Sequence, residues 1–162
     1  MQVPLKDRPY VAVVGAGVAG TELISVAEDV GRALARGGAV VLCGGLGGVM
    51  EAVCRGCRAA GGTSVGILPG DRRDGANDYV DVALATGMGE MRNALIVRAA
   101  DVVLALGGEH GTLSEIAFAL KIGRPVVGLG TWELSKAGVA DESIVRAGSA
   151  EEAVATALRL AT

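Results

Sequence analysis

The chain has 162 residues, the length of one ordinary domain, and it is 51% hydrophobic and 20% charged, a composition that excludes an intrinsically disordered protein. Its net charge of −3 and its aromatic content of 2% argue against a nucleic-acid-binding protein, because such proteins carry basic surfaces and stacking platforms. No apolar stretch reaches the about 18 residues that a membrane span needs, and the charged segment 1–9 lacks the apolar core of a secretory signal. We therefore expect a cytoplasmic protein that contacts neither membrane nor nucleic acid.

Apolar runs and amphipathic segments alternate along the chain. A short β-rich run over 10–14 predicts a buried strand, and apolar residues spaced three and four apart over 21–36 predict an amphipathic helix. The pattern then repeats, with strands expected over 39–43, 64–68, 80–85, 101–106 and 125–129 and helices over 49–60, 91–100 and 112–122. A short strand over 144–146 and a last helix, opened by a capping box of Ser149 and Glu152, complete the pattern.

This alternation defines the expected fold class. Strands that alternate with helices pair in parallel through right-handed crossovers, and continuously apolar strands are covered on both faces. No stretch resembles a linker, and no internal repeat is evident. The sequence therefore predicts an α/β protein: a single Rossmann-like nucleotide- or phosphate-binding domain over 1–162, with a parallel sheet of six or seven strands and helices on both faces. Its ligand should bind at the carboxyl ends of the strands.

Glycine accounts for 26 of the 162 residues and gathers in loops that follow predicted strands. Four such loops, 15–20, 44–48, 86–89 and 107–112, should share one edge of a parallel sheet. Glycine lets the backbone approach a phosphate closely, and the N-terminus of a following helix favours anions. We therefore predict a phosphate or nucleotide site formed by Gly15, Gly17, Gly44, Gly45, Thr86, Gly87, Gly107, Gly108, Gly111 and Thr112.

The first loop fits the dinucleotide pattern G-x-G-x-x-G over 15–20. A classical NAD site also needs an acid at the end of the second strand, where this chain has Cys43 followed by Gly44 and Gly45. The glycines of this loop could instead serve only a tight turn and close helix packing, or contribute to another nucleotide or phosphate site.

Two charged residues stand just behind these loops. Arg92 lies early in a predicted helix, where the helix dipole disfavours a cation unless an anion balances it. Glu115 lies one turn inside its helix, and helical side chains lean back toward the N-terminus, which directs its carboxylate toward the fourth loop. The alternatives are that Arg92 is solvated or paired with Glu90, and that Glu115 only completes a capping box with Thr112.

The cysteines and the single histidine predict no metal site. Cys54 and Cys57 form a C-x-x-C inside a predicted helix, and with Cys43 they make only three thiols. Zinc would need a fourth ligand, and His110 lies in a distant loop. We expect three buried thiols without a disulfide, while His110 could either hydrogen-bond a phosphate or lie at the surface.

The segment 107–115, G-G-E-H-G-T-L-S-E, resembles the P-G-G-x-G-T-x-x-E motif of the LONELY GUY or "lysine decarboxylase-like" family of cytokinin-activating phosphoribohydrolases. Segment 43–50 is similar to the family's G-G-G-x-x-G-L-M, and 66–69 to its G-x-x-P. Arg92 matches the arginine of the family's M-H-x-R-K motif. The resemblance covers nearly the whole chain, although Leu106 replaces the motif proline and the histidine and lysine beside the arginine are absent.

The segments 86–89, 92–93 and 107–112 together look closer to the molybdenum-cofactor-carrier-like group. That resemblance implies a carrier or sensor for a phosphorylated nucleotide-like ligand, either a nucleoside monophosphate or a molybdopterin-type molecule, with no required cofactor. The LONELY GUY resemblance implies the alternative, hydrolysis of the N-glycosidic bond of a nucleoside 5′-monophosphate. Glu115 would then stabilise the positive charge on the ribose while Arg92 orients the substrate. Proteins of this resemblance pair through helices near the ligand, so we expect a homodimer or a higher homo-oligomer.

Overall fold

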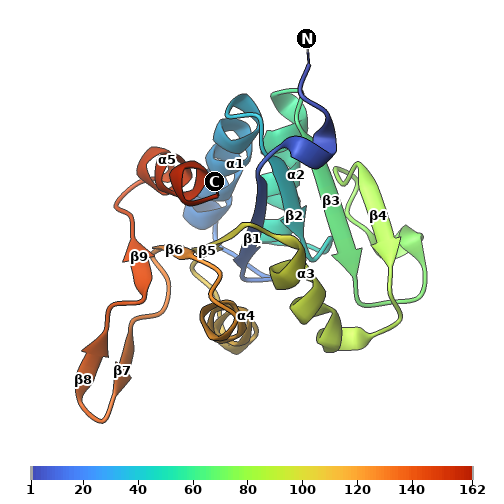
Figure 1. Cartoon of the computed structure of the whole chain (residues 1–162). Coiled ribbons are helices and arrows are strands. Elements are labelled where there is room, and N and C mark those ends of the chain that lie inside the picture. Colours follow the sequence, from blue (N-terminus) through green and yellow to red (C-terminus); the bar gives the residue numbers. More distant parts are fainter. Residues whose placement is uncertain (1, 162) are drawn as a thin grey trace.

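The computed structural model describes residues 2–161, and in this part of the chain seven strands form one sheet in the order β4-β3-β2-β1-β5-β6-β9 (Figure 1). Every neighbouring pair in this sheet is parallel. The strands are β1 (Tyr10–Gly15), β2 (Val40–Cys43), β3 (Thr63–Leu68), β4 (Val82–Ala85), β5 (Val102–Leu106), β6 (Val126–Leu129) and β9 (Ile144–Arg146). The predicted α/β fold with a parallel sheet is confirmed.

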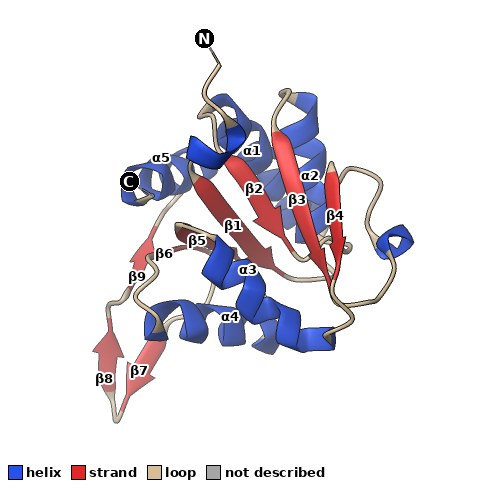
Figure 2. Ribbon diagram, turned by 45° about the vertical axis from the view of Figure 1, so that its right-hand side comes forward, coloured by secondary structure: helices blue, strands red, loops and turns tan. Residues whose placement is uncertain are grey.

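Helices cover both faces of the sheet (Figure 2). One face carries α1 (Thr21–Arg36), α2 (Val49–Ala59) and α5 (Ala150–Leu160), and the other carries α3 (Asn93–Ala99) and α4 (His110–Lys121). Residues 2–161 also include three short 3-10 helices: η1 (Leu5–Asp7) precedes β1, whereas η2 (Arg73–Gly75) and η3 (Gly89–Arg92) lie in connections. None of the helices described over 2–161 combines the length and apolar character required to cross a membrane.

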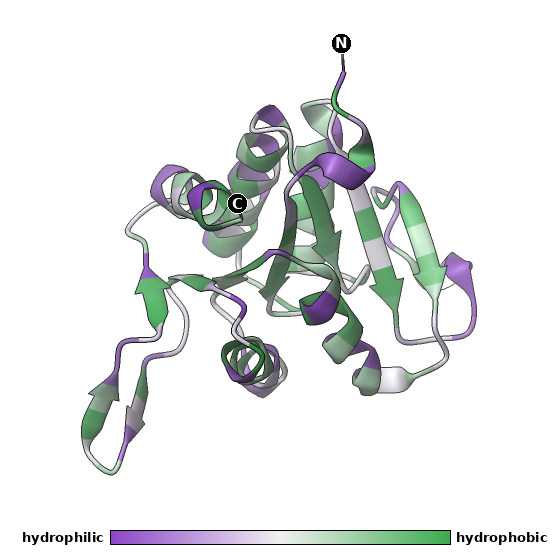
Figure 3. Ribbon diagram, in the orientation of Figure 1, coloured by the Kyte–Doolittle hydropathy of each residue, from purple (hydrophilic) through white to green (hydrophobic). Residues whose placement is uncertain are grey.

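The two layers of core explain why the central strands are apolar throughout (Figure 3). Successive strand residues point to opposite faces of a sheet. In β1, Val11 and Val13 therefore belong to the core beneath α1, α2 and α5, whereas Ala12 and Val14 belong to the core beneath α3 and α4. A strand buried on both faces shows no polar alternation, which is the pattern of a parallel sheet.

Several predicted boundaries differ from the observed ones. The predicted helix over 91–100 is the 3-10 helix η3 followed by α3, and α4 begins at His110 instead of Thr112. The last helix begins as expected: the Glu152 N–H donates to Ser149 Oγ at 3.1 Å, and the Glu152 carboxylate accepts from the Gly148 N–H at 2.7 Å.

A hairpin that the sequence patterns did not predict projects from the sheet after β6 (Figure 1). Its strands, β7 (Leu134–Lys136) and β8 (Val139–Asp141), are antiparallel and pair with each other. Ala137 and Gly138 form the turn with φ of 51° and 80°. Tight hairpin turns need positive φ and usually use Asn-Gly or Asp-Gly, so an Ala-Gly turn gives little signal in the sequence.

Candidate functional site

A cleft of about 670 Å³ opens at the carboxyl ends of β1, β2, β3 and β5. Its walls come from the end of β1, the loops after these strands, η3, and the first residues of α2, α3 and α4. The residues that line it are Val13, Val14, Gly15, Ala16, Gly17, Val18, Gly44, Leu46, Met50, Pro69, Glu90, Arg92, Asn93, Glu109, Gly111, Thr112 and Glu115. Loops far apart in the sequence thus meet at one edge of the sheet, because parallel strands place their carboxyl ends together.

The N-terminus of α4 opens onto this cleft. Glu109 is the N-cap residue but makes no side-chain cap, and its carbonyl accepts the N–H of Leu113 at 3.0 Å. Among the described residues, no hydrogen bond uses the N–H groups of His110, Gly111 and Thr112. A Cβ at Gly111 would meet no atom within 4 Å. Three free donors, a helix dipole and open space beside Gly111 together form a cradle that can accept an anion.

The earlier start of α4 changes the roles of two predicted residues. Thr112 lies inside the helix, so the alternative in which Thr112 and Glu115 form a capping box is wrong. Thr112 is buried beneath Gly108, whose φ is +100° and where a Cβ would overlap the threonine side chain. Glycine at position 108 therefore lets the loop fold back over its own helix.

Arg92 is buried, with 8% of its surface exposed. Its Nε donates to the Ile67 carbonyl at 2.8 Å, its Nη2 donates to the Gly44 carbonyl at 3.4 Å, and its Nη1 donates to the Asn93 side-chain oxygen. Burial lowers the pKa of Arg92 from its ordinary value, while nearby Glu115 opposes that change. The alternatives of a solvated arginine or one paired with Glu90 are therefore wrong: the guanidinium joins β3 to the second glycine loop and borders the cleft.

Glu115 is also 8% exposed and lines the cleft one turn after Thr112. Burial raises the pKa of Glu115 to about 7, and the charge of Arg92 offsets part of this shift. No hydrogen bond to its carboxylate occurs within the described part of the chain, and no ion pair there joins it to Arg92 within 4.0 Å. Glu115 is thus a buried carboxyl group without a hydrogen-bonding partner that faces the cleft.

The first two glycine loops pack against each other. The Val49 N–H donates to the Ala16 carbonyl at 3.0 Å. Gly48 has a φ of +65°, and a Cβ at this position would overlap the backbone of Ala16 and Gly17. At Gly15 a Cβ would lie 2.6 Å from the Leu106 carbonyl oxygen, whereas at Gly17 it would meet nothing within 4 Å. Gly15 therefore serves close packing, and Gly17 leaves open space at the cleft.

The cleft contains some of the predicted residues and not others. Gly15, Gly17, Gly44, Arg92, Gly111, Thr112 and Glu115 line it, whereas Gly45, Thr86, Gly87, Gly107 and Gly108 do not. Thr86 and Gly87 instead hold the loop after β4 against the end of β3: the Thr86 hydroxyl donates to the Leu68 carbonyl at 2.6 Å, and the Gly87 N–H donates to the Gly70 carbonyl at 2.8 Å.

Sequence reasoning missed the apolar wall of the cleft. Val18, Leu46, Met50 and Pro69 line it, as does Asn93 beside the arginine. Pro69 lies within the segment that resembles the family's G-x-x-P, and Asn93 follows Arg92, so the resemblance could have indicated both. Leu46 and Met50, the latter in the first turn of α2, lie within segment 43–50, so the resemblance covers them as well. Val18 is an ordinary apolar loop residue that carries no recognisable signal of its own.

The predicted burial of the three cysteines is confirmed. Cys43 and Cys54 lie with their Sγ atoms 3.5 Å apart in the core behind the second loop. In the described chain, no group of three or more His, Cys, Asp or Glu residues is arranged to hold a metal ion. The fold places these thiols behind the cleft and not in its lining.

The segment before the projecting hairpin supports the fourth glycine loop from outside. The Trp132 indole N–H donates to the Glu109 carbonyl at 3.2 Å, and the Thr131 hydroxyl donates to the Gly107 carbonyl at 2.6 Å. The rings of His110 and Trp132 lie 5.6 Å apart. His110 is exposed and packs against this tryptophan, and it does not line the cleft.

A doubly covered parallel sheet, with a cleft over the glycine loops at its carboxyl edge, defines a Rossmann-like α/β protein. The sequence model of the SLOG cluster4 family matches residues 8–157, so the chain belongs to that family.

Solved structures and a curated relative agree with this membership. A molybdenum cofactor binding protein from Rippkaea orientalis has a TM-score of 0.87 and 34% identity, covering 96% of this chain and 98% of its own. The molybdenum cofactor carrier protein of Chlamydomonas reinhardtii has a TM-score of 0.82 and 30% identity, and the match covers 94% of this chain and 98% of the carrier protein. A cytokinin riboside 5′-monophosphate phosphoribohydrolase of Mycobacterium tuberculosis is 32% identical over 68% of this chain, which spans 64% of that enzyme's length. The resemblance to the LONELY GUY superfamily and its carrier-like group is thereby confirmed.

Proposed function

We propose that this protein is a carrier or sensor that binds a phosphorylated, nucleotide-like ligand in the cleft. The observation that carries the proposal is the N-terminus of α4, where the N–H groups of His110, Gly111 and Thr112 have no partner within the described chain and the dipole favours an anion. The phosphate would bind there, between α4 and the open side of Gly17. Likeness to two molybdenum cofactor proteins over nearly the whole chain supports a ligand-binding role.

A molybdopterin-type ligand fits the residues that line the cleft. Its phosphate would lie against the start of α4, and its ring system against the apolar wall of Val18, Leu46 and Met50. The volume of about 670 Å³ lies within the range of small-molecule sites, and a mostly apolar wall with a few polar groups is their usual make-up. A nucleoside monophosphate has the same two parts, an anionic head and a flat ring, and fits by the same reasoning.

The test is calorimetric titration of AMP into the wild-type protein and into the Gly111→Val variant. A side chain at position 111 would enter the open space beside the helix N-terminus without touching protein atoms, so the variant should keep its circular dichroism spectrum and lose its affinity. Ala117→Val, on the exposed side of the same helix, is the matched control and should bind normally. Equal affinity of wild type and Gly111→Val would refute the proposed anion cradle.

A specific observation also keeps a hydrolase as the second candidate. The cleft holds Glu115 and Arg92 together, and a buried carboxylate near C1′ of a bound ribose could stabilise the positive charge that develops as the N-glycosidic bond breaks. The 32% identical phosphoribohydrolase supports this candidate. Incubation with the common nucleoside 5′-monophosphates, followed by chromatography, tests it. Base release that disappears in Glu115→Ala would establish the hydrolase, and intact nucleotides would exclude these substrates.

We also propose that two copies associate through an exposed apolar patch formed by Val82, Leu84, Met88, Met91 and Leu95. Val82 and Leu84 pair with Val65 and Ile67 of β3, and Ile67 belongs to the core under α3, so the patch lies on the α3 face of the sheet. Met91 is 73% exposed. Contiguous exposed apolar side chains typically mark an interface, and closed two-fold dimers are the commonest assembly. The patch also adjoins Glu90 and Arg92 of the cleft.

Light scattering tests the association. The wild-type protein should have the mass of a dimer at micromolar concentration, and Met91→Asp should reduce it to that of a monomer. Val139→Asp, at an equally exposed apolar residue in the projecting hairpin, is the control and should leave the mass unchanged. A wild-type protein with the mass of a monomer would refute the dimer.

A further inference from the structure

The charges around the cleft conflict with the anion that we propose it binds. Three carboxyl groups line it, those of Glu90, Glu109 and Glu115, and Arg92 is its only lining cation within the described residues. Three of the five N–H groups of the arginine already donate to Ile67, Gly44 and Asn93. With every group ionised, the lining would carry two more negative than positive charges and would repel a phosphate.

The three carboxyl groups differ in how easily water can screen them. Glu90 and Glu109 lie at the rim and are exposed, so their charges are solvated. Glu115 is more than nine-tenths buried, faces the cleft and receives no hydrogen bond from the described residues. Glu115 shares one face of α4 with Thr112, and Thr112 lies one turn closer to the free N–H groups. A phosphate at the helix N-terminus would therefore be repelled more by the buried charge of Glu115 than by the solvated charges of Glu90 and Glu109.

We infer that the carboxyl group of Glu115 takes up a proton when a phosphate dianion enters the cleft, so that this protein binds the anion and a proton together. The inference rests on the proposed function. Neutral Glu115 removes the buried repulsion and adds one O–H donor that can face the ligand. The proton comes from solvent and returns to it when the anion leaves.

The charged and titratable groups around Glu115 are consistent with this exchange. The cleft places Arg92 and Glu90 of η3 and Glu109 at the start of α4 around it, and the buried Cys43 thiol lies behind the cleft, where it acts on Arg92. Burial already raises the pKa of Glu115 to about 7, and Arg92 alone opposes this. An incoming dianion would raise that pKa further, because like charge disfavours ionisation. Near neutral pH a modest change in pH would thus shift the balance between anion capture and release.

Proton uptake also separates the two candidate functions. The hydrolase needs an ionised Glu115 beside the ribose while the nucleotide is bound, since only a carboxylate stabilises a developing cation. A carrier gains from a neutral Glu115, which holds the anion without attacking the bond. The protonation state of Glu115 in the complex therefore distinguishes binding from catalysis, even when neither activity is followed directly.

The experiment is calorimetric titration of AMP at about pH 8, where the phosphate, with a second pKa near 6, is almost entirely dianionic. Repetition in HEPES and Tris, which differ in ionisation enthalpy, gives the number of protons exchanged from the change in observed heat. Wild-type protein should take up close to one proton per AMP, and Glu115→Gln should take up none. The variant should bind about tenfold more tightly at this pH, because only about a tenth of wild-type Glu115 is neutral there.

The controls use the two exposed carboxyl groups at the rim. Glu90→Gln and Glu109→Gln should still take up one proton and should change the affinity less than Glu115→Gln does. AMP binding without proton uptake would overturn the inference and leave the proposed function intact. Binding that requires Mg²⁺, with no proton uptake, would assign the charge balance to a metal ion and overturn it as well. No binding of AMP or pyrophosphate under any condition would refute the proposed function, and the inference with it.

Discussion

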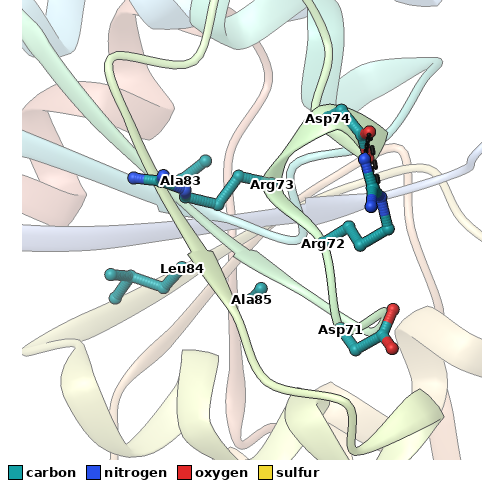
Figure 4. A pocket seen from close by; sticks show the side chains of 7 residues that line it. All are labelled: Asp71, Arg72, Arg73, Asp74, Ala83, Leu84 and Ala85. Carbon is teal, nitrogen blue, oxygen red and sulfur yellow. Dashed lines mark hydrogen bonds and ion pairs between the residues drawn. The ribbon is translucent and has the colours of Figure 1, made fainter.

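The structure has two hollows of nearly equal size, one at the carboxyl edge of the sheet and one beside its edge strand β4. The cleft has about 670 Å³, and a second hollow between β4 and the segment 71–74 has about 630 Å³. Both are bordered by arginine and carboxylate side chains. In the second hollow Arg72 pairs with Asp74 at the surface, and Asp71 lies nearby (Figure 4). Arg72 lowers the pKa of Asp74, whereas burial raises the pKa of Glu115 in the cleft.

The difference lies in what holds each charge in place. Around β4 Arg72 and Asp74 pair with each other, and the side chains of residues 71–74 are all exposed, so water solvates these charges without a ligand. In the cleft Arg92 is fixed by backbone carbonyls from β3 and the second loop, and Glu115 is buried with no hydrogen bond from the described chain. Buried charged groups that the fold does not neutralise, and not the volume of a hollow, indicate a binding site. Matched substitutions in the two hollows can test this distinction.

The largest effect should come from removing the buried guanidinium. Arg92→Ala leaves the carbonyls of Ile67 and Gly44 without their donor, and the free energy of unfolding should fall by about 3–5 kcal/mol. Arg72→Ala should leave it unchanged within error, because that ion pair is fully exposed. Urea unfolding of both variants measures the contrast. Equal losses would mean that burial does not distinguish the two arginines.

The second effect is the pH dependence of stability from Glu115. Its pKa rises from 4.5 to about 7 on folding, so the folded protein binds more protons between these values and its stability falls as pH rises through this window. The loss should reach about 3 kcal/mol above pH 7. Glu115→Gln should abolish this difference in urea unfolding between pH 5 and pH 8. Asp74→Asn is the control: Asp74 has a lowered pKa, so its small contribution has the opposite sign and disappears on acidification.

The smallest effect concerns two glycines whose Cβ would meet nothing. At Gly17 and Gly70 no atom lies within 4 Å of an added Cβ. Alanine at either position should therefore raise the free energy of unfolding by about 0.5 kcal/mol, since it restricts the unfolded chain. Only Gly17→Ala, beside the proposed anion cradle, should also weaken AMP binding in calorimetry. Unchanged affinity in Gly17→Ala would remove the first loop from the binding site.

Much of the fold followed from hydrophobic periodicity. The helix over 21–36 and the strand over 144–146 have the predicted bounds, because a strong periodic pattern agrees with what the sheet requires. The hairpin β7–β8 was not predicted, since its strands have three residues each and its turn is Ala-Gly. The start of α4 was placed two residues late, because Gly111 looked like a loop residue and lies in the first turn of the helix.

The candidate site was predictable in part, because the predicted topology already fixes which loops meet. Parallel topology alone brings the glycine loops to one edge, so Gly17, Gly44 and Gly111 could be assigned to it from the sequence. Whether a given glycine faces a ligand or a neighbouring backbone depends on angles of a few tens of degrees, which composition does not encode. Gly108 lies over Thr112, and Thr86 bonds back to Leu68, so both stay outside the cleft lining.

The contact between Trp132 and the Glu109 carbonyl gives the protein a built-in optical reporter. Trp132 is the only tryptophan in the chain, so all indole fluorescence comes from a single place, against the outside of the loop that we propose holds the phosphate. Movement of that loop, or a new charge beside it, would shift the emission of one fluorophore with no background from others. Stopped-flow fluorescence of the unlabelled protein could then follow capture and release of an anion in real time.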